Sequence, residues 1–341
     1  MHARYAKWGL KMLRLKKIAV AFGLVTAAVS MSASVMAADW KGWNIHVTGY
    51  PNTVAMDDFA RLVKEKTQGR IDLKMYHAGT LGNQSDAIEQ VRLGALAIGN
   101  FSLGPIGPIA PEANVVSLPF VFSSVEQAFR AMDGEVGQKI SDGLEKKGLI
   151  ALAYHDSGSR SFYNTQKPIT EPSDVEGMKV RVMNNDLYSG MITALGGNPS
   201  PMAFSEVYQA LKTNVVNGAE NNFPSYESTG HHEVAGFYSL SQHLIIPECV
   251  CINAKIFNDL PAADQKAVRE AAQESALLQR KLWSERKVAS REKVLASGVK
   301  INEIADDQKL AFQAAMEPVH KGFLAKNPEL VSLVELIKNT K

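Results

Sequence analysis

The chain has 341 residues, of which 45% are apolar, 21% charged and 8% aromatic, as in an ordinary globular protein with one large or two medium domains. Its first 37 residues hold six Lys or Arg and no Asp or Glu, so the remainder carries 31 basic and 35 acidic residues, a net charge of −4. No basic run or interleaving of aromatic and basic residues remains, and a nucleic-acid partner is not expected.

The first 37 residues are predicted to be a signal peptide. A basic start precedes an apolar run at residues 18–30, which is too short for a comfortable membrane span. Val35, Met36 and Ala37 supply the small or apolar residues that a signal peptidase needs, so we place cleavage after Ala37 and expect an exported protein. A retained membrane anchor is the alternative.

Short apolar strands alternate with amphipathic helices at the start of the mature chain. Strands are expected at residues 43–49, 70–76 and 97–104, and helices at residues 53–69 and 83–96. This spacing predicts βαβ units and a mostly parallel sheet.

The alternation restarts further along the chain, which suggests a second lobe. The expected helices are 118–132, 186–197 and 204–214, and the expected strands lie within 148–160, 178–185, 218–222 and 242–257. Extended segments near residues 154–161 and 243–250 are predicted to cross between the two lobes.

Residues 261–298 consist of strong helix formers without an internal Gly or Pro. A helix of this length exceeds one small lobe, so we expect it to lie along both; a solvent-exposed coiled-coil seam is the alternative. We assign residues 38–157 and 247–286 to lobe I and residues 158–246 and 287–341 to lobe II.

The two cysteines, Cys249 and Cys251, are separated by one residue in an apolar strand. Their side chains share a face but run parallel, which strains a bridge, so we interpret them as buried small hydrophobes rather than a disulfide. No nearby residues complete a metal site, and neither a metal nor a cofactor is expected.

Enzyme signatures are absent from the sequence. It has no phosphate-binding loop, no G-x-S-x-G and no H-E-x-x-H. His155 and Asp156 stand too close to Ser157 in the chain to indicate a triad. His231 and His232 are adjacent and are interpreted as a polar surface turn. We therefore predict no catalytic residues, with an exported hydrolase using the His155 or His231 region as the rival hypothesis.

Two arginines indicate an anion site. Arg160 follows a strand among small residues that leave its guanidinium accessible, and Arg181 lies within the strand "KVRVM". A guanidinium held in a strand beneath a cleft can bind a carboxylate through two parallel hydrogen bonds. The alternative is a structural ion pair with a local acid such as Glu176.

Several longer segments carry a resemblance: "GSRSFYNTQKPI", "SDVEGMKVRVMNN", "ALGGNPSPMAFSEVYQALKTNVVNGAENN" and "LVKEKTQGRIDLKMYHAGTLGNQSDAIEQVRLGAL". In order along essentially the whole mature chain, they resemble the DctP-type solute-binding receptors of tripartite ATP-independent periplasmic (TRAP) transporters. The resemblance implies an α/β, two-lobed periplasmic-binding-protein-like fold. Each lobe is a mixed sheet flanked by helices, and crossing strands form the hinge.

The resemblance also implies roles for individual residues. Arg181 matches the arginine that pairs with the ligand carboxylate, Asn221 matches an asparagine that also bonds it, and Arg160 matches a second cleft arginine. Gln84 stands where many members carry Glu, which favours a purely acidic, hydroxylated ligand.

The segment "GAENNFPSYEST", with the Tyr50-Pro51 pair, resembles the members that bind hexuronates such as glucuronate and galacturonate. Amide and carboxylate groups can bond sugar hydroxyls, and aromatic rings can stack on a pyranose. The expected ligand contacts are therefore also Glu220, Asn222, Tyr50, Phe223 and Tyr226, although local packing explains Glu220, Phe223 and Tyr226 as well.

The resemblance implies a monomeric periplasmic receptor that delivers a small organic acid to the small and large TRAP membrane subunits. A C4-dicarboxylate or another small organic acid is the alternative ligand. Presentation of the ligand to a membrane sensor is the alternative role.

Overall fold

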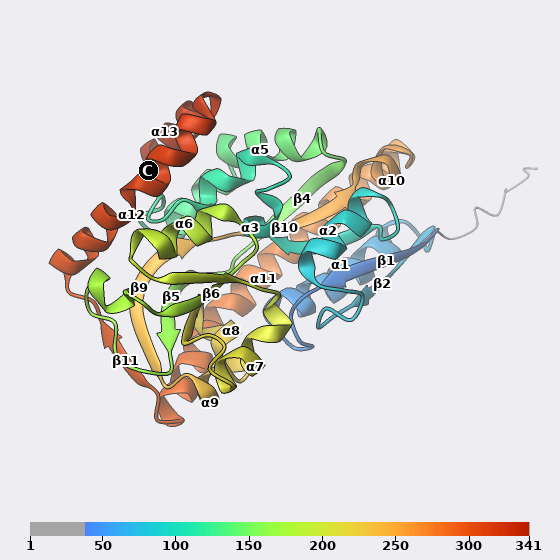
Figure 1. Ribbon diagram of the computed structural model, residues 1–341. Coiled ribbons are helices and arrows are strands. Elements are labelled where there is room, and N and C mark those ends of the chain that lie inside the picture. Colours follow the sequence, from blue (N-terminus) through green and yellow to red (C-terminus); the bar gives the residue numbers. More distant parts are fainter. Residues whose placement is uncertain (1–37, 341) are drawn as a thin grey trace, which may run out of the picture. The chain divides into compact units, whose positions relative to one another are not determined.

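The computed structural model describes residues 38–340, and the predicted signal peptide lies outside them. The described chain forms two β-sheets flanked by helices (Figure 1). No helix within these residues combines the length and the apolar composition that crossing a bilayer requires.

The first sheet has the strand order β2-β1-β3-β10-β4. β1 pairs in parallel with β2 and β3, whereas β10 is antiparallel to β3 and β4. Helices α1 and α2 connect the parallel strands, as the spacing predicted. The elements are β1 (Ala38–Asn44), α1 (Pro51–Lys66), β2 (Ile71–Tyr76), α2 (Gln84–Arg92), β3 (Ile98–Ser102), β4 (Leu149–His155) and β10 (Glu248–Asn253).

The expected strand at residues 43–49 is wrong in position, because β1 ends at Asn44. The chain then turns through Gly49, whose φ of 84° lies in the left-handed region, before Pro51 opens α1. Trp40 and Trp43 do not follow the alternation of apolar and polar residues that marks a strand, so the sequence pattern did not reveal where β1 lies. The position of β1 is evident from its pairing with β2.

The second sheet has the strand order β11-β9-β5-β8-β6-β7. β5 is antiparallel to β8 and β9, while β6 is parallel to β7 and β8, so this sheet is mixed. Its strands are β5 (Ser159–Asn164), β6 (Lys179–Val182), β7 (Asn198–Pro201), β8 (Gly218–Asn221), β9 (Phe237–Ile245) and β11 (Lys300–Glu303).

Two short segments connect the sheets, residues 156–158 from β4 to β5 and residues 246–247 from β9 to β10, and a third connection runs from β10 through α10 and α11 to β11. The long helix α11 (Ala262–Ala296) contacts α1 and β4 beside the first sheet and α8 (Phe223–Ser228) beside the second. The two-lobed fold with a helix along both lobes is therefore confirmed, whereas the residue boundaries of the lobes remain a prediction.

The C-terminal helices contact elements beside both sheets. α12 packs on α6, and α13 packs on α5, which lies against β4. The remaining helices are α3 (Leu103–Ile106), α4 (Val125–Met132), α5 (Glu135–Glu145), α6 (Asp186–Ala194), α7 (Val207–Lys212), α9 (His231–Val234), α10 (Ala254–Asn258), α12 (Asp306–Lys326) and α13 (Val331–Asn339). Short 3-10 turns occupy Pro111–Ser117, Pro172–Val175, Phe204–Glu206 and Pro328–Leu330.

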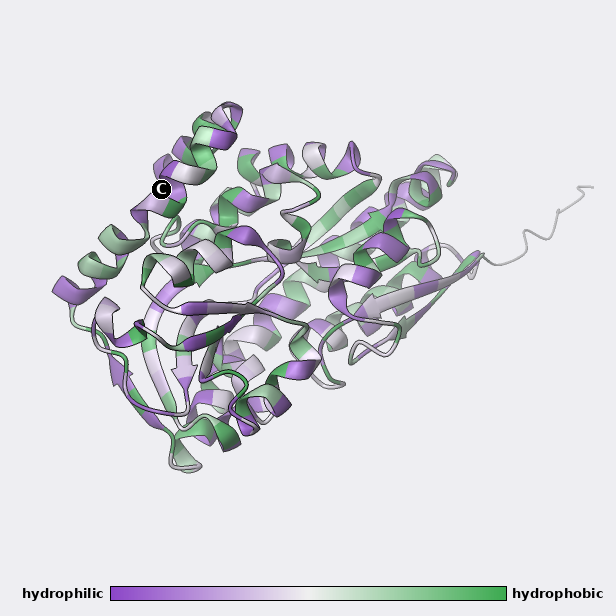
Figure 2. Ribbon diagram, in the orientation of Figure 1, coloured by the Kyte–Doolittle hydropathy of each residue, from purple (hydrophilic) through white to green (hydrophobic). Residues whose placement is uncertain are grey.

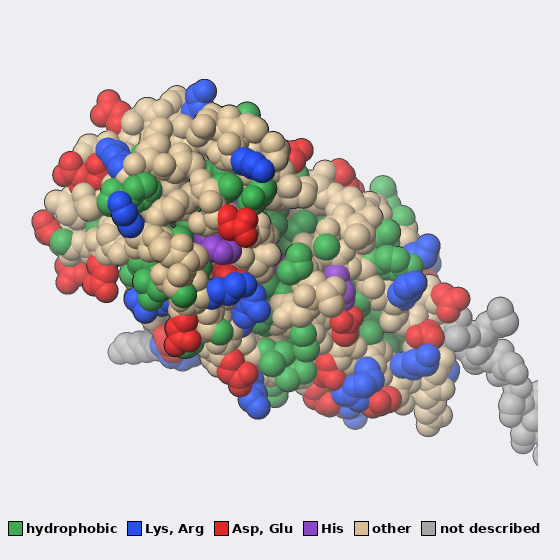
Figure 3. Space-filling view, turned by 90° about the horizontal axis from the view of Figure 1, so that it is seen from below, with side chains coloured by type: hydrophobic (Ala, Val, Ile, Leu, Met, Phe, Trp, Pro, Cys, Tyr) green, Lys and Arg blue, Asp and Glu red, His purple; other side chains and the backbone are tan. Residues whose placement is uncertain are grey.

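Apolar residues fill the strands and the helix faces that cover them (Figure 2). Beside the first sheet, Phe59 and Val63 of α1 pack with Ala272 of α11 and Ile252 of β10, all fully buried. On the outside, acidic and basic side chains are interspersed over the face that Figure 3 shows. The core therefore ties α11 to the first sheet by apolar contact.

The interpretation of Cys249 and Cys251 as free thiols is wrong, because the structure joins them in a disulfide. A register shift between Val250 and Cys251 interrupts the pairing of β10 with β4. The two Cα atoms are 5.4 Å apart, within the range that a disulfide spans. We expected parallel side chains because we assumed a regular strand, and the strand is irregular between these two cysteines.

Glu227 links α8 to α11. Its carboxylate is buried and receives hydrogen bonds from Arg286 and Lys293. We expect Glu227→Gln, which keeps the shape but removes the charge, to lower the free energy of unfolding by about 1.5–3 kcal/mol, the range for hydrogen bonds to charged groups.

Chemical denaturation measures this loss, and Glu274→Gln on α11 is the matched control. Glu274 is exposed and pairs with Lys66 at 2.8 Å, so its loss should cost below about 1 kcal/mol. Equal effects of the two substitutions would contradict a structural role for Glu227.

Candidate functional site

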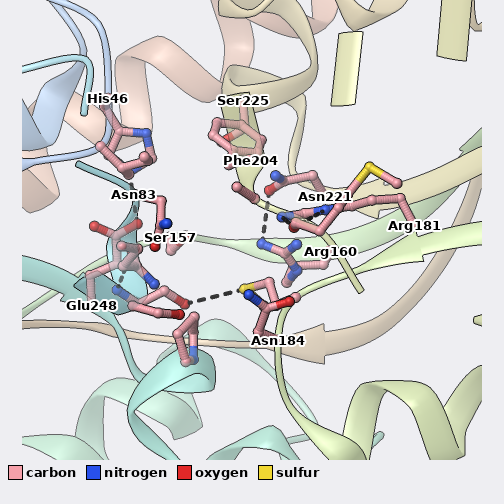
Figure 4. A pocket seen from close by; sticks show the side chains of 18 residues that line it. His46, Asn83, Ser157, Arg160, Arg181, Asn184, Phe204, Asn221, Ser225 and Glu248 are labelled. Atoms are coloured by element: carbon pink, nitrogen blue, oxygen red, sulfur yellow. Dashed lines mark hydrogen bonds and ion pairs between the residues drawn. The ribbon is translucent and has the colours of Figure 1, made fainter. Parts of the chain in front are cut away.

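A pocket lies between the two sheets and is lined by residues from both (Figure 4). Its empty volume, which includes space open to solvent, is about 600 Å³. The first-sheet side supplies Ile45, His46, Asn83, Gln84, Ser85, Ser102, Pro105 and Glu248. The remaining lining residues are Ser157, Arg160, Arg181, Met183, Asn184, Met202, Ala203, Phe204, Asn221 and Ser225.

Arg181 lies in β6 with only 3% of its surface exposed. Its Nε and Nη2 both donate to the carbonyl oxygen of Met202, at 3.1 and 2.8 Å, and its guanidinium lies 5.7 Å from the ring centroid of Phe204. The ion pairs formed within residues 38–340 include none with Arg181, so the alternative pairing with Glu176 is not formed.

Burial lowers the pKa of Arg181 to about 10, because desolvation disfavours the charged form. At neutral pH the side chain is still a cation. Within the described chain this buried charge therefore lacks a carboxylate counterion, and an anion in the pocket would supply one.

Arg160 is more enclosed than the sequence suggested, with 4% of its surface exposed. Its Nε and Nη2 donate to the two carboxylate oxygens of Glu220 at 2.5 and 2.8 Å. Burial alone would lower the pKa of Arg160, but the Glu220 charge raises it above its ordinary value. The expectation of an accessible side chain is wrong because β8 places Glu220 beside β5.

Asn221 connects this ion pair to the pocket. Its Oδ1 accepts hydrogen bonds from Nη1 of Arg160 at 2.9 Å and from the backbone N–H of Asn222 at 2.8 Å. These two bonds fix the amide orientation. Its Nδ2 donates to no other group within residues 38–340, and the residue lines the pocket. Asn221 therefore offers a donor to a ligand.

Three other predicted site residues are polar, and one of them lines the pocket. Gln84 lies in the lining, and its Oε1 accepts from the backbone N–H of Ser102 at 3.4 Å. Glu220 is fully buried beneath Arg160. Asn222 caps α8, and its Nδ2 donates to the carbonyl oxygen of Ser157 at 2.9 Å.

The predicted aromatic residues pack behind the pocket lining. Tyr50 stacks on His46 with ring centroids 3.9 Å apart, and its hydroxyl bonds Ser225 at 2.9 Å. Phe223 stacks on Tyr238 at 4.2 Å. Tyr226 is fully buried, and its hydroxyl donates to the carbonyl oxygen of Ala235. The structure does not bring these rings into the pocket.

The pocket also contains residues that the sequence reasoning missed, among them Phe204, His46 and Glu248. Phe204 follows β7, which is parallel to β6, and ligands collect beyond the carboxyl ends of parallel strands. Glu248 was also detectable, as a single carboxylate in the otherwise apolar segment "IIPECVCIN". His46 had no distinctive sequence signal.

The interpretation of His231 as a surface residue is wrong. His231, the first residue of α9, is buried, and its Nδ1 lies 2.7 Å from the hydroxyl of Tyr163 in β5. His155 is also fully buried, and neither of its ring nitrogens has a hydrogen-bond partner in the part of the chain that the structure describes. The described residues contain no group of three or more potential metal ligands.

A two-lobed α/β fold with a polar pocket between its sheets is the architecture of a solute-binding protein. The family model "Bacterial extracellular solute-binding protein, family 7" (DctP) matches residues 45–327. The chain belongs to this DctP family of TRAP solute-binding proteins.

Individual relatives agree with the family. A solute-binding protein of Chromohalobacter salexigens is 53% identical over 330 residues, covering 97% of each chain. A TRAP periplasmic solute-binding protein from Roseobacter denitrificans, solved with bound β-D-glucuronate, is 66% identical with a TM-score of 0.88. Another from Sulfitobacter sp. NAS-14.1, solved with β-D-galacturonate, is 57% identical with a TM-score of 0.87. Both solved structures cover 89% of this chain and are themselves covered completely.

The buried histidines predict an acid-sensitive fold. Burial lowers the pKa of His155 to about 4, and that of His231 and His243 to about 3. These imidazoles take up protons near pH 6.5 in the unfolded chain but remain neutral there in the folded chain. The free energy of unfolding therefore falls as the pH drops below about 6.5. Asp156 opposes this, because burial raises its pKa to about 6.

We expect the melting temperature to decrease steadily between pH 7 and pH 4.5. His155→Gln should reduce the slope of the free energy of unfolding against pH by up to about 1.4 kcal/mol per pH unit, the contribution of one proton, and should therefore make the melting temperature less dependent on pH. Thermal melts across this range measure both effects, and a melting temperature that stays constant from pH 7 to pH 5 would contradict the interpretation.

Proposed function

We propose that this protein is a periplasmic receptor that binds a hexuronate of the glucuronate or galacturonate type between its lobes. The proposal includes cleavage of the signal peptide after Ala37 and delivery of the ligand, by a monomeric receptor, to the TRAP membrane subunits. The bound sugar acids of the two solved relatives support the ligand class. The receptor role requires binding without turnover.

The observation that carries the proposal is the unengaged edge of Arg181. Since Nε and one Nη2 hydrogen are directed at Met202, the edge formed by Nη1 and Nη2 remains for a ligand. This edge matches the two oxygens of a carboxylate. Asn221 offers its Nδ2 from the neighbouring strand β8, so two fixed donors can converge on one carboxylate.

The rest of the pocket suits a hydroxylated ring. Phe204 presents an aromatic face beside Arg181, and such faces stack on the apolar side of a pyranose. Asn184, Ser157 and Ser225 add amide and hydroxyl groups that exchange hydrogen bonds with sugar hydroxyls. A ligand that contacts both lobes at once favours the closed arrangement, because its affinity is higher for that state.

Arg181→Ala should abolish most of the affinity for D-glucuronate. The substitution removes the anchoring charge and is expected to cost about 2–5 kcal/mol, or roughly 30- to 5,000-fold in Kd. Isothermal titration calorimetry measures the loss, and Arg61→Ala, a partly exposed residue of α1, is the control. An affinity within threefold of wild type would reject the role of Arg181.

Asn221→Asp separates binding from folding. Its Oδ1 can still accept from Arg160 and Asn222, whereas the donor Nδ2 becomes an oxygen that repels a carboxylate. We expect at least tenfold weaker D-glucuronate binding with a melting temperature close to wild type. If the melting temperature falls sharply while the folded fraction binds normally, Asn221 is a structural residue.

A further inference from the structure

The pocket wall opposite the arginines carries a carboxylate. Glu248 opens β10 and is 3% exposed, and His46, which follows β1, is 7% exposed. Figure 4 shows these two residues on one side of the pocket and Arg160, Arg181 and Asn221 on the other. The pocket therefore has an acidic end and a basic end.

Buried hydrogen bonds fix the Glu248 carboxylate in place. His46 Nε2 lies 2.8 Å from Oε1, and Asn52 Nδ2 donates to Oε2 at 2.8 Å. Gln279 of α11 in turn donates to Oδ1 of Asn52 at 2.8 Å, and Asn52, like Gln279, is fully buried. Because Asn52 and Gln279 are held by several partners, the carboxylate cannot swing away from the pocket without breaking a buried network.

The acidic end accepts hydrogen bonds from a ligand. An ionised carboxylate has only acceptor sites, and each of its oxygens retains a further lone-pair direction beyond the bonds to His46 and Asn52. Because an ionised carboxylate only accepts, Nε2 of His46 donates to Glu248. Ligand hydroxyl groups are the natural donors to this end.

The charges of the lining complement one carboxylate but not two. The charged residues of the lining are Arg160, Arg181 and Glu248. Glu220 neutralises Arg160 through two hydrogen bonds, which leaves Arg181 as the cation available to a ligand. A second ligand carboxylate at the far end would face Glu248, and two like charges at close range repel each other in a buried site.

We propose that Glu248, positioned by His46 and Asn52, is a specificity determinant that restricts the site to sugar acids with a single carboxylate. It selects ligands whose far end carries a hydroxyl group and rejects aldarates and C4-dicarboxylates, whose far end carries a second carboxylate. This inference rests on the proposed uronate function, because it assumes that the first carboxylate binds at Arg181.

The test compares D-glucuronate with D-glucarate, in which a second carboxylate replaces the C1 aldehyde carbon. Calorimetry is carried out with the mature wild-type protein, Glu248→Gln and the surface control Glu274→Gln. Wild type and the control should bind D-glucuronate at least tenfold more tightly than D-glucarate. In Glu248→Gln, D-glucarate should bind at least tenfold more tightly than in wild type, while D-glucuronate binds several-fold more weakly.

D-glucarate is an open chain, so its affinity differs from that of D-glucuronate for conformational reasons as well. The decisive comparison is therefore D-glucarate binding to wild type and to Glu248→Gln, because the free ligand is the same in both titrations. Unchanged D-glucarate binding by a folded Glu248→Gln would overturn the inference. Equal wild-type affinities for the two ligands would overturn it without any variant, including when Glu248→Gln fails to fold. Absence of both D-glucuronate and D-galacturonate binding to wild type would instead reject the proposed function, and the inference with it.

Discussion

The site depends on Arg181, a buried cation that has no carboxylate counterion among residues 38–340. Its position in β6 and its two bonds to Met202 hold the guanidinium rigidly, and burial makes its charge costly. A bound carboxylate would therefore offset the desolvation cost of the Arg181 guanidinium, and this offset would contribute to the free energy of binding. A rigid arginine also loses little side-chain entropy on binding, in contrast to a lysine on a flexible stem.

Arg160 illustrates the opposite use of the same residue type. Glu220 accepts three of its five N–H donors, two at the carboxylate and one at the backbone carbonyl, and a fourth N–H is donated to Asn221 and orients its amide. The two arginines thus divide the work, since one leaves its charge available to a ligand and the other places a neutral donor beside it. A pocket with two uncompensated guanidinium groups would favour dianions, and the Arg160–Glu220 pair prevents this.

The sequence predicted the alternation of strands and helices up to β3, the two extended crossing segments and the long helix, because these follow from hydrophobic periodicity and chain spacing. It misplaced β1 and did not predict β7, β11, α5, α12 or α13. Arg181 and Asn221 were also predicted to lie at the pocket, through the family resemblance. The segment 220–226 was harder to interpret. Its polar and aromatic residues suggested ligand contacts, but Phe223 and Tyr226 pack within the second lobe and Asn222 caps α8. Periodicity shows which face of an element is apolar. It does not show which polar side chains from distant parts of the chain will meet, as Glu248 and His46 do.

The polar network behind Glu248 connects recognition to the hinge. Gln279 bonds Asn52 in the first lobe and also bonds both the backbone N–H and the carbonyl of Asp156, where the chain crosses between the sheets. One residue of α11 therefore supports the acidic end of the pocket and the first crossing segment together. Since these groups are buried and bonded to one another, a movement of the crossing segment would either move Glu248 as well or break hydrogen bonds of the network. The groups proposed to contact the far end of the ligand and the first crossing segment are parts of one hydrogen-bonded network.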